Sequence, residues 1–142
     1  MLKDKQLTKK EKGEKLITEV KGLTGLEKVV SKGINKIKKF IIETNSKNMA
    51  LKELEMNRMK SIEKIEEIYE NTNSYLIMKR LIDVANEINE KYNFAVEEIE
   101  KVYASDLKTE KKLGSFEEIV SITDAYYSVI IDNVERTKIT SS

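Results

Sequence analysis

The sequence of 142 residues contains neither cysteine nor histidine, and its 26 basic and 25 acidic side chains leave a net charge of +1. Without these two residue types the sequence offers no disulfide, no Ser-His-Asp triad, no Cys-His pair and no Cys/His zinc site. Proline is absent and glycine occurs five times, so the sequence lacks the turn residues that hairpins and βαβ units need.

The small net charge conceals two parts of opposite sign. Residues 1–40 contain 12 lysines and 5 acids, a net charge of +7, whereas residues 41–142 contain 14 basic and 20 acidic side chains, a net charge of −6. A basic arm on an acidic body allows two interpretations. Either the two parts attract each other within the fold, or the arm binds an anionic partner.

The first residues are polar and rich in lysine. Residues 1–13 have no apolar core and end at Gly13, so we expect a flexible basic tail there and no secretory signal. No run of about 18 apolar residues occurs, and we therefore predict a cytoplasmic protein. A single helical domain is expected over residues 14–138, beginning with a short helix over residues 14–23 and followed by a tail at 139–142.

A clear helical period begins at Leu26. One stripe at 100° per residue collects Gly33 and seven apolar side chains: Leu26, Val29, Val30, Ile34, Ile37, Phe40 and Ile41. Four lysines on the other side are the candidate binding residues: Lys28, Lys32, Lys36 and Lys39. The polar residues 44–48 leave open whether residues 26–70 form one helix or two. The polar residues 71–74 predict a turn and the cap of the next helix.

The strongest pattern follows this turn, over residues 75–112. Its apolar positions step by four and three residues, a seam typical of helix-on-helix packing: Leu81, Ala85, Ile88, Tyr92, Ala95, Ile99 and Val102. We expect one continuous helix that ends at Gly114. Ser115 and Glu118 then fit a capping box at the start of a last helix, which carries a wide apolar arc.

Together these patterns predict an all-α fold, an elongated antiparallel bundle of three to four helices with a coiled-coil-like seam. Heptads do not show whether the partner of a seam belongs to the same chain. A helical homo-oligomer is therefore an alternative to packing within one chain.

Three interpretations compete for residues 19–40. The G-x-x-G of Gly22 and Gly25 resembles the phosphate-binding loop of KH nucleic-acid modules, but those modules also contain a sheet and no strand pattern flanks this motif. A basic amphipathic helix also suits a membrane surface, although the sequence has no tryptophan to anchor it there. The favoured interpretation is a glycine corner followed by the first long helix of the bundle.

Carboxylates are the remaining candidates for chemistry. Two groups of glutamates, within residues 63–70 and 97–100, have the ligand type that Mg²⁺ takes. Lysines three and four residues away instead indicate a solvated helix face. No calcium loop and no glycine-rich nucleotide motif occurs. We therefore predict no metal, no cofactor and no small-molecule substrate.

These observations favour a non-catalytic helical protein that binds another protein, as an adaptor, inhibitor or assembly component, or that pairs with itself. The alternative is nucleic-acid binding through the lysine-rich N-terminal arm, since phosphate contacts need only basic side chains. A third hypothesis is a metal-dependent enzyme built on carboxylates.

Overall fold

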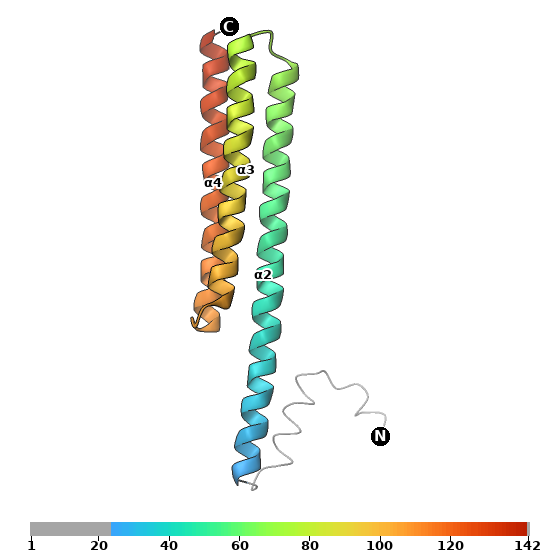
Figure 1. Cartoon of the computed structure of the whole chain (residues 1–142), viewed down its shortest axis with the longest axis vertical. Helices are drawn as coiled ribbons and strands as arrows, with labels where there is room; N and C mark the ends of the chain where they lie inside the picture. Colours follow the sequence, from blue (N-terminus) through green and yellow to red (C-terminus); the bar gives the residue numbers. More distant parts are fainter. Residues whose placement is uncertain (1–23, 142) are drawn as a thin grey trace, which may run out of the picture. The chain divides into compact units, whose positions relative to one another are not determined.

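The computed structural model describes the backbone of residues 24–141 and the side-chain environment of residues 29–136. Three helices make up almost all of this part of the chain: α2 over Thr24–Glu70, α3 over Tyr75–Ala104 and α4 over Thr109–Ser141 (Figure 1). No strand occurs among the described residues, which confirms the all-α prediction. The tail expected over 1–13 and the short helix expected over 14–23 lie outside the described residues.

The chain divides into two structural units, one up to Ile42 and one from Glu43. In the first unit, the described residues 24–42 are helical and belong to α2. The second unit contains the remainder of α2 together with α3 and α4. Because α2 is one helix through residues 44–48, the polar run there does not break it.

Two hydrophobic clusters hold the second unit together. The first contains Ile65, Ile68, Ile77, Leu81, Val84, Ile88, Tyr127, Ile130, Ile131 and Val134. The second contains Ala50, Leu54, Ala95, Ile99, Phe116 and Val120. Each cluster takes side chains from all three helices, and Figure 1 shows α3 and α4 side by side, running in opposite directions. The second unit is therefore a bundle-like packing of helices around two apolar clusters.

The turn predicted at residues 71–74 is confirmed. Helix α2 ends at Glu70, and the Asn71 amide nitrogens, backbone and side chain, both donate to the Glu67 carbonyl, at 3.2 and 2.8 Å. Ser74 is the N-cap of α3, and its Oγ accepts a hydrogen bond of 3.3 Å from the Ile77 amide. This bond satisfies one of the amides that the first helical turn leaves without a partner.

The continuous helix expected over residues 75–112 is wrong, because α3 ends at Ala104. Ser105 adopts an extended conformation, with φ −75° and ψ 170°, and both its backbone amide and its hydroxyl donate to the Val102 carbonyl. The same hydroxyl accepts from the Leu107 amide at 3.3 Å. A serine that bonds nearby backbone groups offers the chain an alternative to the helix, which explains why the chain turns here.

The expected helix boundary at Gly114 and the expected capping box of Ser115 and Glu118 are also wrong. All three residues lie inside α4, which begins at Thr109 and continues past residue 138 to Ser141. The side chain of the next apolar residue, Phe116, is only 2% exposed in the second cluster. Tertiary packing of this helix outweighs the low helix propensity of a single glycine.

Candidate functional site

Large apolar side chains are exposed along the first unit. On α2, Val29, Ile37 and Phe40 keep 67%, 61% and 63% of their surface accessible, and Ile41 keeps 46%. At 100° per residue these four side chains fall within one side of the helix. They are termed the apolar stripe below. Exposed apolar side chains gathered on one helix face are typical of a surface that binds a partner.

The predicted lysines belong to the same helical segment. Lys32, Lys36 and Lys39 are exposed, and Lys28 lies in α2 with a side chain outside the described residues. Residues 24–42 contain five lysines and one glutamate, so this segment has a net charge of +4. The structure therefore places apolar contact area and positive charge on one helix.

Two glycines of this region, Gly25 and Gly33, lie inside a helix and not in a loop. Gly25 lies inside α2, and Gly22 lies outside the described residues. Gly33 is exposed, and a Cβ atom built on it would meet no atom within 4 Å. Glycine inside a helix costs about 1 kcal/mol relative to alanine, and nothing around Gly33 in the described structure requires that cost.

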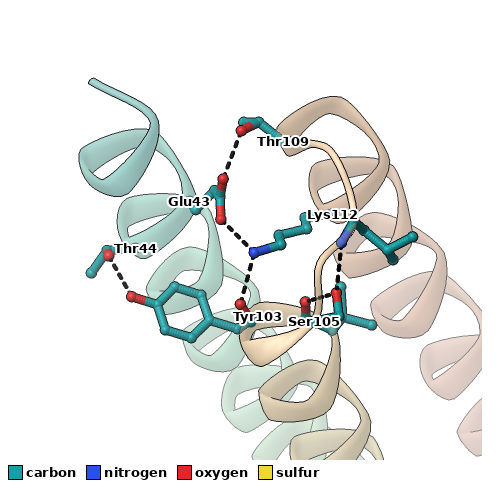
Figure 2. Close-up of polar contacts among 8 residues, drawn as sticks. Glu43, Thr44, Tyr103, Ser105, Thr109 and Lys112 are labelled. Atoms are coloured by element: carbon teal, nitrogen blue, oxygen red, sulfur yellow. Dashed lines mark hydrogen bonds and ion pairs between the residues drawn. The ribbon is translucent and has the colours of Figure 1, made fainter. Parts of the chain in front are cut away.

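A buried polar network joins α2, α3 and α4 at one end of the second unit, as Figure 2 shows. The Lys112 ammonium donates to Glu43 Oε1 at 2.7 Å and to the Tyr103 carbonyl at 2.9 Å, and the two side chains of the ion pair are only 10% and 14% exposed. Thr109 donates to Glu43 Oε2 at 2.6 Å, and the hydroxyls of Thr44 and Tyr103 share a hydrogen bond of 2.8 Å. The network holds the turn between α3 and α4 against α2, which is a structural task.

A second polar group surrounds Arg58. Its guanidinium pairs with Glu55, donates to Asn89 Oδ1 at 3.2 Å and lies 4.7 Å from the centre of the Tyr92 ring. The hydrogen bond from Arg58 holds the pKa of the Glu55 carboxyl below its usual value. Arg58 Nε and the Tyr127 hydroxyl are both buried without a hydrogen-bond partner. Burial raises the pKa of Tyr127 to about 12, so its hydroxyl stays protonated at neutral pH.

The helices of the second unit leave grooves between them. One groove, termed the α2/α3 groove below, has a volume of about 230 Å³ and is lined by Ile62, Ile65, Glu66, Tyr69, Glu70, Leu81, Ile82 and Ala85. Its floor is fully buried at Leu81, while Tyr69 and Ile82 remain 41% and 54% exposed. Its only charged lining residues are the two glutamates, so the groove combines apolar surface with negative charge.

A further groove lies between α3 and α4. It has a volume of about 290 Å³, and its exposed apolar residues are Phe94 and Ile122. Its charged lining residues are Lys91 and Glu98, one of each sign. This groove therefore has no charge preference of its own.

The carboxylate groups singled out from the sequence do not converge. Glu63, Glu66, Glu67 and Glu70 are exposed on α2, and no group of three acidic side chains within residues that the structure describes is placed to hold a metal ion. Within the same residues, every helix is too short or too polar to cross a membrane.

Long-range polar pairs were beyond the reach of the sequence patterns. Glu43 and Lys112 are 69 positions apart, and Arg58 and Asn89 are 31 positions apart. One signal was present: Arg58 continues the steps of four and three residues that lead from Leu54 to Ile65. A charged residue inside such an apolar register indicates a buried partner across the helix interface.

Comparison with known proteins adds nothing to this geometry, because no protein-family model, no curated protein and no solved structure matches this chain.

Proposed function

We propose that this protein acts by binding another protein through residues 29–42 of α2, as an adaptor, inhibitor or assembly component. The observation that carries the proposal is the exposure of the apolar stripe, whose three most exposed side chains keep 61% to 67% of their surface accessible. Burying one side chain of this size fully contributes about 1.5–3 kcal/mol. A partner that covers the stripe would gain several such contributions.

The lysines around the stripe support an anionic partner. Charged groups at the edge of an interface steer association and exclude partners of the same charge, while the apolar centre supplies most of the affinity. A protein with an acidic helical surface satisfies both requirements. The helix-in-groove mode, in which an amphipathic helix lays its apolar face into a groove, describes this geometry.

Nucleic-acid binding is the second candidate, favoured by the exposed Lys32, Lys36 and Lys39. Phosphate contacts of this kind depend on charge and lose affinity steeply with salt. An apolar stripe adds little to such binding. The two candidates therefore differ in which side chains they need.

The experiment is an affinity capture from lysate of the native host, with and without nuclease, read by mass spectrometry. The wild-type chain is compared with Ile37→Asp/Phe40→Asp, which alters the stripe, and with Lys32→Glu/Lys36→Glu/Lys39→Glu, which alters the charge. The matched control is Val129→Asp, since Val129 is 58% exposed on α4. Protein binding predicts stoichiometric partners that survive nuclease and disappear with the stripe variant. Partners that disappear with nuclease and persist with the stripe variant would establish the nucleic-acid alternative instead.

We further propose that the second unit is an elongated antiparallel bundle whose seam is coiled-coil-like. The burial of Leu81, Ile88, Ala95 and Ile99, each at most 2% exposed, supports this arrangement. In this proposal the bundle is the rigid support that carries the binding helix.

A further inference from the structure

The described structure has two exposed apolar surfaces, and the charged side chains beside them are of opposite sign. The apolar stripe belongs to a helical segment with five lysines and one glutamate. The α2/α3 groove is lined by six apolar side chains and by Glu66 and Glu70. Each surface has the chemistry that the other lacks.

We propose that the occupant of the α2/α3 groove is the apolar stripe of a second copy of this chain. This inference rests on the proposed function and names its partner. Charge complementarity selects the occupant, because lysines that flank the stripe would meet the glutamates at the groove. Direct pairing of two stripes is disfavoured, because it would bring two segments of net charge +4 together.

Phe40 is the anchor of this contact. It is the one aromatic residue in residues 24–42 and is 63% exposed. Tyr69 and Ile82 at the groove are exposed and apolar, so an inserted phenyl ring would cover them and the floor formed by Leu81. Buried aromatic side chains that fill a pocket typically dominate the affinity of an interface.

Gly33 supplies an independent argument for a close partner. It lies seven residues before Phe40, two helical turns away, and therefore on the same side of the helix. The space beside it is open, with no atom within 4 Å of a built Cβ. A glycine at such a place lets the backbone of another helix approach closely. Gly114, also exposed and inside a helix with no atom within 4 Å, lies outside the proposed contact and is its matched control.

The contact joins different surfaces of the two copies. Each copy carries one stripe and one groove, so the assembly either closes into a dimer or ring or extends into a chain. In either case the weight-average mass of the particles in a solution of the purified full chain must rise with protein concentration. Self-association must also weaken as salt screens the charges, although the apolar contact keeps it from vanishing.

The test is sedimentation velocity of the purified full chain and of two single variants. Phe40→Asp damages the stripe and leaves the groove intact, whereas Ile82→Asp damages the groove and leaves the stripe intact. Each variant alone is expected to be monomeric. An equimolar mixture of the two is expected to form a one-to-one dimer, because the intact stripe of one fits the intact groove of the other. Circular dichroism establishes that both variants are folded, and Glu66→Lys/Glu70→Lys replaces Ile82→Asp if that variant unfolds.

The glycine pair provides the second measurement. Gly33→Leu is expected to raise the apparent Kd of self-association at least tenfold, and Gly114→Leu is expected to leave it within twofold. Equal effects of the two substitutions would overturn the close approach at Gly33 and with it the proposed contact.

Three further outcomes overturn the inference. A wild-type chain that stays monomeric at every concentration excludes the second copy, while partners captured from lysate through the stripe would still support the proposed function. A mixture of Phe40→Asp and Ile82→Asp that stays monomeric excludes the groove as the acceptor. Co-sedimentation of a monomeric wild-type chain with anionic phosphatidylserine vesicles, lost in Phe40→Asp, would assign the stripe to a membrane surface.

Discussion

Replacing Tyr127 by phenylalanine is expected to stabilise the second unit. The Tyr127 side chain is 1% exposed within the first cluster, and its hydroxyl has no hydrogen-bond partner. Leaving a buried polar group without a partner costs about 1–3 kcal/mol. Since phenylalanine keeps the ring and its packing, the free energy of unfolding should rise by about 1 kcal/mol or more. For a chain of this size that corresponds to a rise in Tm of about 3–5 °C.

The assay is urea denaturation followed by circular dichroism, together with thermal melts of the same samples. The neighbouring residue provides a matched control. The Tyr126 hydroxyl donates a hydrogen bond to the Glu87 carboxylate, so Tyr126→Phe removes a bond that Tyr127→Phe does not. Tyr126→Phe is therefore expected to give no stabilisation. A lower stability for Tyr127→Phe would refute the reasoning, because it would show that the hydroxyl has a partner, such as a buried water shared with Arg58 Nε.

The pH dependence of stability tests the same side chain. Burial raises the pKa of Tyr127 to about 12, against 10.0 for an exposed tyrosine. Below pH 10 both the folded and the unfolded state hold the proton, so the group does not affect stability. Between pH 10 and 12 the unfolded state loses the proton first, and the free energy of unfolding falls by about 1.4 kcal/mol per pH unit. The free energy of unfolding is measured against pH for the wild-type chain and for Tyr127→Phe, and the difference between the two curves is the contribution of the Tyr127 hydroxyl. Curves that stay parallel between pH 10 and 12 would contradict this expectation.

Three further substitutions test the polar and helical features of the second unit. Lys112→Met removes the ammonium from the buried Glu43 carboxylate, which keeps its hydrogen bond from Thr109, and is expected to lower the free energy of unfolding by about 3 kcal/mol, whereas the exposed Lys111→Met should change it little. Ser74→Ala removes the cap of the Ile77 amide and should cost about 1 kcal/mol in urea denaturation. Gly114→Ala meets no neighbour and should raise the free energy of unfolding by about 0.5–1 kcal/mol, so an unchanged or lower Tm would show a constraint at that position.

Helical periodicity predicted the buried positions of α3 and polar residues predicted the end of α2, but the end of α3 was missed. Leu81, Ile88 and Ile99 are fully buried at the positions where the steps of four and three residues place them. The spacing of apolar residues shows which face of a helix is buried, and a short break in the helix does not change this spacing. The turn after Ala104 depends instead on the Ser105 hydroxyl, whose bond to the Val102 carbonyl competes with the helix locally. Gly114, the stronger sequence signal for an end, was overridden by the packing of α4.

The candidate site shows a different limit of sequence reasoning. The lysines of the first unit were predictable, because charge depends only on residue type. The ion pair of Glu43 with Lys112 was not, because it requires knowing how three helices come together. The α2/α3 groove was not predictable either, since its lining residues come from two helices and form no motif in the sequence of either helix.

The most informative comparison lies within α2 itself. Steps of four and three residues connect Ile37 and Phe40 to Leu54 and Ile65, and this period is the same on both sides of the polar residues 44–48. Leu54 and Ile65 are 0% and 5% exposed, whereas Ile37 and Phe40 are 61% and 63% exposed. Periodicity therefore predicts that a helix face is apolar, but not what covers it. A face that carries the same register as the interior and stays exposed is the physical reason to search for a partner there.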